Sequence, residues 1–545
     1  MWASLLSSAI VLVLLVASPA SCWHDESGSW FQPTKGEIWP VPNSRTLKED
    51  FYLLRPSNFD IRVNGETCDI VIEAVERYTR IILTEARIAR LVTEGQPRTS
   101  VRDDPHFKGT LEALSIRLQQ PCEQNGEHWP HLHMNESYKL EINETSPIAV
   151  LRAEAVWGIL RGLETFSQVL APSGDGPTLK VKCQTIVDQP KLPHRGLLLD
   201  TSRHYLPLSD ILLTLDAMSY NKLNVLHWHI VDDNSFPYQS TRYPELSAKG
   251  AFHHSMIYTP NDVQKVVDYA RLRGIRVMPE FDTPGHTKSW GLAYPELLTI
   301  CYDSTGKPSG KLGPMNPTKQ ALYEFVRNLF SEIVQVFPDQ YIHLGGDEVP
   351  FNCWASNPEI IAYMKAHNMS KYELLENEYI AQVLAISNSL DASTIVWQEV
   401  FDNGVVLPTT TVVHVWKAQR WQKELERATM AGHPVLLSSC WYLDHIDSGG
   451  DWIKFYNCDP FDFVGAANAT NLMLGGETCM WGEFVDRSNV HPRIWPRASA
   501  AAERLWSFKK QDNNAAAQRL EEHACRMNRR GIPAQPPNGP GFCVI

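Results

Sequence analysis

The sequence lacks the marks of several protein classes. After residue 22 no run of eighteen or more apolar residues occurs, so no later segment is expected to span a membrane. No block rich in Lys and Arg stands out, and the formal net charge is -12, which argues against a nucleic-acid partner. Internal repeats and low-complexity tracts are missing as well. A globular protein is therefore expected, since 43% of the 545 residues are hydrophobic and can fill more than one core.

The first 22 residues are typical of a cleaved signal peptide. An apolar core covers residues 9–17 and small residues follow at Ser18 and Ala20, although no Lys or Arg precedes the core. Of the eleven cysteines, Cys22 lies in or beside this segment, which leaves ten that can pair in an oxidising compartment. Candidate glycosylation triplets support secretion only weakly, because four is near the number expected by chance; they begin at Asn135, Asn143, Asn368 and Asn468.

Residues 23–190 are predicted to form a small α+β domain. "TCDIVIEAVERYTRII" predicts a β-rich start that leads into an amphipathic helix, and "LEALSIRLQQ" and "ESYKLEINE" alternate as strands do. "SPIAVLRAEAVWGILRGLETFSQVL" predicts a strand and then a long helix. The two prolines of "DQPKLPHRG", residues 188–196, mark the expected domain boundary.

Residues 191–545 have a regular pattern. Eight short β-rich runs occur near residues 196, 223, 274, 341, 394, 411, 434 and 472, and helix-like segments lie between most of them. Eight strand–helix units fit a (β/α)8 barrel better than an open doubly wound sheet. No G-x-G-x-x-G follows the first strand, so no dinucleotide cofactor is expected.

Functional side chains of such barrels lie at the carboxyl ends of the strands, and polar and aromatic residues gather there in this sequence. The first four strands end near Asp200, Arg203, Asp232, Asp233, Glu280, Asp282, His286, Asp347 and Glu348. The last four end near Trp397, Glu399, Trp416, Trp441, Tyr442, Asp444, Trp481 and Glu483. Each tryptophan taken alone would more often be structural. Together, acids that transfer protons and indoles that cover sugar faces predict a carbohydrate-cleaving pocket.

The adjacent acids Asp347 and Glu348 in "YIHLGGDEVP" raise a specific question. Consecutive strand side chains point to opposite faces, so both acids serve one site only where the backbone leaves the pleat. Gly345 and Gly346 make such a departure possible. The alternative is the start of a helix, with Asp347 as N-cap and Glu348 in the first turn.

Several motifs, in order, resemble the family 20 glycoside hydrolases, the β-N-acetylhexosaminidases, and closely their lysosomal-type subunits. The motifs are "DTSRHYLP", "NVLHWHIVDDNSFP", "EFDTPGH", "HLGGDE", "VWQEV", "WYLD" and "CMWGE". The resemblance covers both domains and implies removal of terminal β-linked GlcNAc or GalNAc from the non-reducing end. It implies a retaining mechanism in which the sugar's own 2-acetamido oxygen attacks and an oxazolinium forms. It implies neither a cofactor nor a metal.

The resemblance also implies residue roles. Glu348 would be the general acid and base, and Asp347 would orient the acetamido group and stabilise its positive charge, with Tyr442 donating to the acetamide oxygen. Asp232 and His286 would form the relay that supports Glu348; without the resemblance, His286 would be a loop-capping histidine. Arg203 would bind the 3- and 4-hydroxyls and Glu483 the 4- and 6-hydroxyls. The pocket walls would be Trp397, Trp416 and Trp481.

Disulfides, partners and location follow from the same resemblance. It suggests the pairs Cys68–Cys122, Cys301–Cys353 and Cys525–Cys543. Because Cys440 and Cys458 flank the loop with Tyr442, a fourth bridge is expected there, with Cys183 and Cys479 left as free thiols. Glycan substrates (N-glycans, glycolipids or chitin oligomers), a homodimer or a heterodimer with a related subunit, and a lysosomal location are expected, with secretion as the alternative.

Asp444 predicts a preference among sugars. Its carboxylate would accept a hydrogen bond from a neutral 6-hydroxyl but repel a 6-sulfate. A like-charge repulsion of a few kcal/mol would give about a hundredfold preference for the neutral sugar over its 6-sulfate. A protonated His445 would offset part of this repulsion at acidic pH.

Two rival functions remain. His227 and His229 in "HWH" share one face of a strand, as metal ligands do in some barrel hydrolases, although the later strands offer tryptophans where more ligands would be needed. A silent glycan-binding relative would require damage to the catalytic set, yet Asp347, Glu348, Arg203 and Tyr442 are all present.

Overall fold

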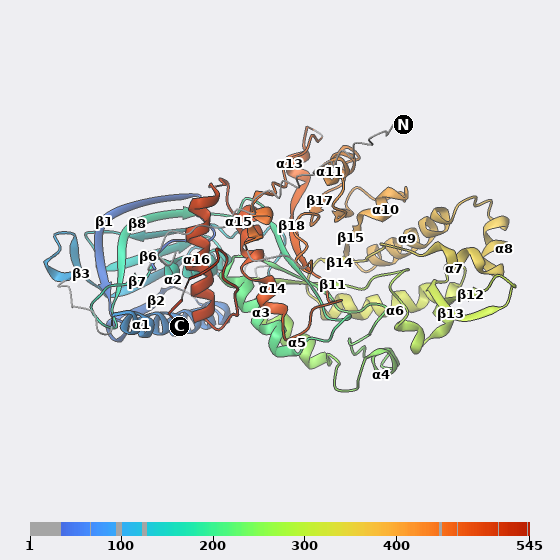
Figure 1. Ribbon diagram of the computed structural model, residues 1–545, viewed down its shortest axis with the longest axis horizontal. Coiled ribbons are helices and arrows are strands. Elements are labelled where there is room, and N and C mark those ends of the chain that lie inside the picture. The colour runs from blue at the N-terminus through green and yellow to red at the C-terminus, as the bar shows by residue number, and fades with distance from the viewer. Residues whose placement is uncertain are drawn as a thin grey trace, which may run out of the picture.

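The computed structural model describes residues 34–65, 67–93, 101–122, 128–445, 450–465, 467–510, 512–541 and 543–544. The predicted signal peptide at 1–22 lies outside the described residues. A sheet domain built from the N-terminal part of the chain and a larger helix-surrounded barrel lie side by side along the long axis of the molecule (Figure 1).

The N-terminal domain is built on a mixed eight-stranded sheet. The strand order is β2-β4-β6-β5-β8-β1-β3, with β7 paired to β8. The strands are β1 Ser44–Leu54, β2 Asp60–Asn64, β3 Phe107–Leu111, β4 Ala113–Leu118, β5 Tyr138–Ile142, β6 Ile148–Ala153, β7 Ala171–Pro172 and β8 Leu179–Asp188. Helix α2, Val156–Gln168, packs on β5 and β6 and against α1, Asp69–Thr93.

The β-rich start predicted for "TCDIVIEAVERYTRII" is wrong. Helix α1 begins at Asp69 and includes the β-branched run that follows. Ile70, Ala74 and Tyr78 recur at helical spacing and are all buried. This packing outweighs the modest cost in helix propensity of β-branched residues.

The last helix of the chain, α16 Asn513–Arg529, lies beside the N-terminal domain (Figure 1). Arg519 donates to the backbone oxygen of Ile38 at 3.1 Å, and Arg530 pairs with Glu164 of α2 at 2.9 Å. The C-terminal segment therefore fastens the sheet domain to the barrel.

Eight parallel strands close into a barrel, which confirms the predicted fold class. Each of the eight predicted runs contributes one strand, and the order around the barrel is β9-β10-β11-β14-β15-β16-β17-β18. The strands are β9 His194–Asp200, β10 Val225–His229, β11 Arg276–Glu280, β14 Tyr341–His343, β15 Ser393–Trp397, β16 Val412–Val415, β17 Val435–Leu437 and β18 Met473–Met480.

Helices cover the outside of the barrel. They include α3 Leu208–Tyr220, α5 Pro260–Arg271, α6 Gln320–Val336, α9 Tyr372–Asn388 and α11 Trp421–Met430. Two helices follow β18, namely α14, Val490–Ile494, and α15, Arg497–Trp506. Pro496 separates them because proline cannot continue the hydrogen-bond ladder of a helix.

The barrel interior changes character along its axis. An apolar cluster contains Val225, Met278, Ile395, Val412 and Leu436. A second set of inward side chains, closer to the carboxyl ends of most of the strands, is polar yet fully buried: His227, Glu280, His343, His414 and Glu477. Gly196 makes room for it, since a Cβ there would lie 2.5 Å from Cγ of Glu477. Sequence patterns did not reveal this buried polar layer.

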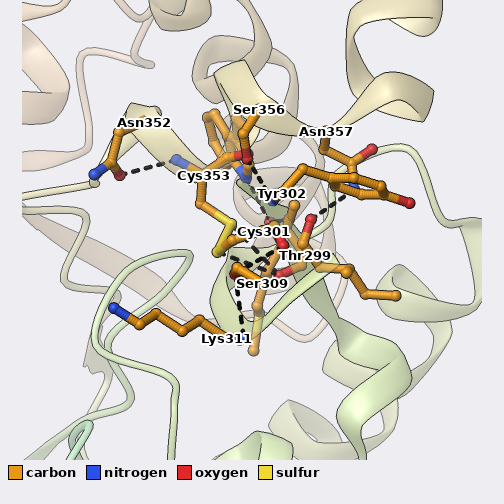
Figure 2. The surroundings of a disulfide bond; sticks show 12 residues. Thr299, Cys301, Tyr302, Ser309, Lys311, Asn352, Cys353, Ser356 and Asn357 are labelled. Carbon is orange, nitrogen blue, oxygen red and sulfur yellow. Dashed lines mark hydrogen bonds between the residues drawn. A yellow bond between two sulfur atoms is a disulfide. The ribbon is translucent and has the colours of Figure 1, made fainter. Parts of the chain in front are cut away.

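An insertion between β11 and α6 forms a hairpin that no sequence pattern predicted. Its strands are β12 Leu298–Tyr302 and β13 Pro308–Met315, and it packs against the short helix α7, Phe351–Ser356. Figure 2 shows the disulfide Cys301–Cys353 that joins the hairpin to α7. The backbone N–H of Tyr302 donates to Ser356 at 2.9 Å, and the Asn357 amide donates to the Ile300 oxygen at 2.9 Å. The segment just after Glu348 is thereby fixed at several points.

Three further disulfides join Cys68 to Cys122, Cys440 to Cys458 and Cys525 to Cys543, and among the described residues Cys183 and Cys479 are unpaired and buried. Among the candidate glycosylation sites, Asn143, Asn368 and Asn468 are exposed, whereas Asn135 is partly buried and donates to Glu154. Within the described ranges, none of the helices combines the length and the apolar character needed to cross a bilayer.

Candidate active site

The loop between β14 and α7 turns both adjacent acids toward one site. Gly345 and Gly346 have φ of 69° and 95°, so the chain leaves the strand in conformations that favour glycine. A Cβ at Gly345 would lie 1.8 Å from Oδ1 of Asp282, and the Gly346 N–H donates to that oxygen at 2.8 Å. The alternative in which Asp347 caps a helix is wrong, because α7 begins at Phe351 with Pro350 as its N-cap.

Backbone strain is concentrated beside this loop. Glu348 has φ of 50° and His286 has φ of 54°, in the left-handed region that residues other than glycine rarely adopt. Such conformations cost about 1–3 kcal/mol each and persist where the surrounding structure holds them. Two of the four predicted catalytic residues therefore have strained backbones.

The predicted substrate-binding residues share one hollow with the acid pair. It has a volume of about 140 Å³, well below the ~300–1,000 Å³ of sites for larger ligands, so it suits a single sugar ring. Its lining consists of Arg203, Asp347, Glu348, Trp397, Trp416, Tyr442, Asp444, His445, Trp481 and Glu483. A larger hollow of about 620 Å³ on the N-terminal domain has Asp175 as its single acidic lining residue, so it offers no acid pair.

Four aromatic rings form the wall of the pocket. Trp397 is almost fully buried, and its ring lies 6.5 Å from Trp416 and 6.1 Å from Trp481. The Tyr442 ring lies 6.1 Å from that of Trp416 in a stacked orientation. Trp416 is held in turn by Glu399, which accepts its indole N–H at 2.7 Å. The arrangement offers apolar faces for a sugar ring and its acetamido group.

Arg203 also lines the pocket, among carboxylates. Its guanidinium is 3.0 Å from Asp200, 2.9 Å from Asp232 and 3.9 Å from Glu483. It also lies over the Trp481 ring, at 5.1 Å from the centroid. Although burial alone lowers the pKa of Arg203, the acids outweigh it and raise the pKa, so the cation is permanent.

Asp232, His286 and Glu348, the residues of the predicted relay, lie next to one another. Nδ1 of His286 lies 3.1 Å from Asp232, and Nε2 lies 3.7 Å from both Asp347 and Glu348. Burial lowers the pKa of His286, but the nearby carboxylates Asp282, Asp347 and Asp232 raise it to about 11. His286 is therefore a cation beside the two acids.

A third acid, Asp282, supports Asp347 from below. Side-chain atoms of Asp282, His286 and Asp347 all lie within 4.8 Å of one another. Burial and the negative charge of Asp347 raise the pKa of Asp282 well above its ordinary value. The Asp282 carboxyl is therefore harder to ionise than an ordinary aspartate.

Asp444 and His445 stand at the outer edge of the pocket. The Asp444 side chain is 21% exposed, and Nε2 of His445 lies 3.8 Å from its carboxylate. Burial raises the pKa of Asp444 above its ordinary value. The backbone N–H groups of Leu443 and Cys479 link the Tyr442 segment to β18, and the Cys440–Cys458 disulfide closes it.

A catalytic metal at the "HWH" motif is incompatible with this geometry. Ring nitrogens of His227, His343 and His414 lie within 4.8 Å of one another, and these three could offer nitrogens to a cation. All three are fully buried, however, and the Trp397 ring lies against them. A catalytic metal needs an open position that substrate or water can reach.

Trp441 and Asp233 lie outside the pocket lining, and several buried residues beneath the pocket were not among the predicted site residues. Trp441 is fully buried and donates to the Phe455 oxygen at 3.0 Å, so it is structural. The buried layer beneath the pocket was missed, and the only signal for it was polar residues at inward strand positions: His343, His414 and Glu477.

Comparison with known families matches most of the chain. The profile described as glycosyl hydrolase family 20, catalytic domain, matches residues 192–509. A second profile, described as beta-acetyl hexosaminidase like, matches residues 38–169. Both the barrel and the sheet domain are therefore accounted for.

Individual relatives agree with the family profiles. The human beta-hexosaminidase subunit beta is 48% identical over 513 residues, which cover 93% of this chain and 89% of the relative. The rat beta-hexosaminidase subunit alpha is 46% identical, with 93% and 94% covered. Among solved structures, the chitobiase of Flavobacterium johnsoniae superposes with a TM-score of 0.76 at 27% identity, covering 91% of this chain and 73% of that one.

Proposed function

The chain belongs to glycosyl hydrolase family 20, and from this premise we propose that it removes single terminal β-linked N-acetylglucosamine and N-acetylgalactosamine residues from glycans. The protein is a glycosidase of the β-hexosaminidase type. The observation that carries the proposal is the presence of Asp347 and Glu348 in one small pocket with aromatic walls. A pocket for one sugar ring at the barrel rim favours attack at chain ends.

Glu348 acts as the general acid in the first step. Its side chain is 60% exposed at the mouth of the pocket, where a leaving sugar would lie. It donates its proton to the glycosidic oxygen as the bond to the anomeric carbon breaks. In the second step the resulting carboxylate takes a proton from water, which attacks the same carbon.

The acetamido group of the substrate is the nucleophile. Its carbonyl oxygen attacks the anomeric carbon as the leaving group departs, and an oxazolinium ion forms. The Asp347 carboxylate accepts the acetamide N–H and stabilises the positive charge, and Asp282 and His286 lie beside it. Tyr442 donates to the acetamide oxygen. The wall of Trp397, Trp416 and Trp481 restricts the group to this orientation.

The remaining roles concern binding and support. Arg203 binds the 3- and 4-hydroxyls and Glu483 the 4- and 6-hydroxyls, while Asp232 and His286 hold the proton relay behind Glu348. Asp444, at the pocket edge, accepts a neutral 6-hydroxyl and disfavours a 6-sulfate.

A dimer and a lysosomal or secreted location complete the proposal. Relatives named as alpha and beta subunits support assembly with a second copy or a related subunit. The four disulfides support folding in an oxidising compartment. N-glycans, glycolipids and chitin oligomers are all chemically compatible substrates.

Matched chromogenic substrates test the proposal. The protein should hydrolyse 4-nitrophenyl β-glycosides of GlcNAc and GalNAc, and it should leave the β-glucoside, which has a 2-hydroxyl in place of the acetamide, essentially intact. EDTA should not change the rate. Equal rates on the acetamido and hydroxyl sugars would refute the substrate-assisted mechanism. Loss of activity in EDTA would support the alternative that the protein is a metal-dependent hydrolase.

A further inference from the structure

The pocket rests on a buried carboxylate that the mechanism above does not use. Glu280 ends strand β11, is fully buried and lies beneath the aromatic wall. Its Oε1 accepts the indole N–H of Trp397 at 2.7 Å, and its Oε2 lies 2.6 Å from Nδ1 of His229. One side chain thus contacts both the wall of the sugar pocket and a histidine of the neighbouring strand.

His229 carries this contact on to the relay. Its Nε2 lies 2.7 Å from Oδ2 of Asp232, whose other oxygen is 3.1 Å from His286. Asp232 also pairs with Arg203 at 2.9 Å. A continuous chain of contacts therefore runs from Glu280 through His229, Asp232 and His286 to Glu348.

Charge is arranged along this chain in alternation. Burial lowers the pKa of His229, but the carboxylates of Glu280 and Asp232 on its two nitrogens raise it to about 10, so it is an imidazolium. Burial raises the pKa of Glu280, but the surrounding histidines hold it well below its ordinary value. His227 lies 3.0 Å from Oε2, off the ideal hydrogen-bond direction, and His343 lies 3.3 Å from Oε1. Glu280 is a buried anion with cationic or polar neighbours on every side.

We propose that Glu280 is a positioning residue for the reaction, whose two oxygens hold Trp397 of the sugar pocket and the His229–Asp232–His286 relay in one fixed relation. It touches neither substrate nor Glu348. Glu280 keeps Trp397, which orients the acetamido group, aligned with the His229–Asp232–His286 relay, which supports the general acid Glu348. Reacting groups must be held within about 0.5 Å of their productive geometry, which is why such a support affects rate.

The barrel supplies a matched control for this inference. Glu477 of β18 is equally buried and has the same kind of partners, with His194 at 2.6 Å and His227 at 2.7 Å. It contacts neither Trp397 nor His229 among the described residues. Both Glu280→Gln and Glu477→Gln therefore remove a buried, hydrogen-bonded carboxylate. Only Glu280→Gln also removes the carboxylate that contacts both Trp397 and His229.

The test is a double-mutant cycle with His286, read as kcat on a disaccharide of N-acetylglucosamine, with thermal unfolding as the folding control. Glu280→Gln should lower kcat at least tenfold in the wild type and by a clearly smaller factor in a His286→Asn background, because the part of its effect that passes through the relay is already lost while its support of Trp397 remains. Glu477→Gln should lower the unfolding temperature by a similar amount while kcat stays within threefold. Should Glu280→Gln not fold, His229→Gln breaks the same chain one step later and should show the same non-additivity.

The outcomes separate this inference from the proposed function on which it rests. An equal loss from Glu280→Gln in both backgrounds, or an equal loss of kcat in Glu477→Gln, would overturn the positioning role and leave the mechanism intact. A His286→Asn single variant with wild-type kcat would instead contradict the proposed relay. If both Glu280→Gln and His229→Gln fail to fold, the layer serves stability and the inference is wrong.

Discussion

Glu348 and Glu280 are glutamates of the same barrel with opposite surroundings. Glu348 is 60% exposed on a strained loop, and its nearest cation is His286 at 3.7 Å. Glu280 is fully buried and has Trp397, His229, His227 and His343 around its two oxygens. The rim residue is free to exchange a proton, whereas the buried residue is fixed as an anion. The residues at the rim of the pocket, such as Asp347 and Glu348, therefore perform the chemistry. The buried residues beneath them, such as Glu280, keep them in place.

This comparison makes a general prediction about variants. Substitutions in the rim should change rates while the free energy of unfolding stays nearly constant. Substitutions in the contacts that hold the rim, such as the Cys301–Cys353 disulfide, should change the free energy of unfolding more than the rate.

Glu348→Gln should give the largest loss. It removes the proton that the leaving oxygen needs, so kcat on a GlcNAc disaccharide should fall by about 10³–10⁴, and the unfolding temperature should change little. A substrate with a very good leaving group should suffer less in the first step. Equal losses for good and poor leaving groups, measured by single-turnover kinetics, would show that Glu348 is not the acid.

Asp347→Asn should lower kcat by about 10²–10³, since the positive charge of the oxazolinium would lose its anionic partner. A thiazoline mimic of that intermediate should bind the variant much more weakly than the wild type. Inhibition constants that are the same for both proteins would contradict the role of Asp347 in holding the acetamido group.

The double variant Cys301→Ser/Cys353→Ser tests how the disulfide that holds the segment after Glu348 contributes to stability. This disulfide closes a segment of 52 residues, for which the chain-entropy argument gives about 4 kcal/mol of stability. Chemical denaturation should show a loss of that order, and kcat at low temperature should change less than in either rim variant. A large loss in kcat with unchanged stability would instead show that the disulfide acts on the reaction and not on the stability of the fold.

Glu376 of α9 predicts how stability depends on pH. Burial raises its pKa from 4.5 to about 7, and Asn403 donates to it at 2.8 Å. A carboxyl with a raised pKa stabilises the fold fully below about pH 4.5, and this contribution is lost as the pH rises through about 7. Glu376→Gln should therefore gain on the order of 3 kcal/mol relative to the wild type between pH 4.5 and pH 7.5.

The measurement is denaturant unfolding at the two pH values. Glu324→Gln, at an exposed position of α6, is the control and should show no such difference. A pH-independent effect of Glu376→Gln would show that the buried carboxyl does not titrate in this range.

The smallest effect concerns Asp444. The wild type should prefer neutral GlcNAc glycosides over their 6-sulfates about a hundredfold at neutral pH, and Asp444→Asn should narrow this gap about tenfold. Because burial raises the pKa of Asp444, the preference should also weaken as the pH falls. Comparable values of kcat/KM for both substrates in the wild type would show that the charge of Asp444 does not select the sugar.

The rim was more predictable from sequence than the layer that supports it. Glycines, adjacent acids and tryptophans at successive strand ends carry a local signal, so the eight barrel strands and the pocket residues could be proposed before the structure. For Glu348 the sequence left two alternatives, a departure from the strand pleat at Gly345 and Gly346 or the start of a helix, and the structure has the first. The β-rich start of α1 was mispredicted because its packing partner, α2, is distant in sequence.

The support could not be predicted because it depends on contacts between strands far apart in the chain. Glu280 and Trp397 are 117 residues apart, and His227 and Glu477 are 250 apart. A single histidine or glutamate in a short apolar strand has no periodicity that distinguishes a buried anion from a surface residue. Only closure of the barrel brings these groups together.

The central claim is that the substrate's acetamido group, rather than an enzyme carboxylate, attacks the anomeric carbon. Intact-protein mass spectrometry after rapid quenching of turnover, on wild type and Glu348→Gln with an activated GlcNAc glycoside, tests it most directly. The account predicts an unmodified protein mass at every time point, together with tight competitive inhibition by the thiazoline. A protein mass increased by one N-acetylhexosamine residue, located on a carboxylate by peptide mapping, would contradict it.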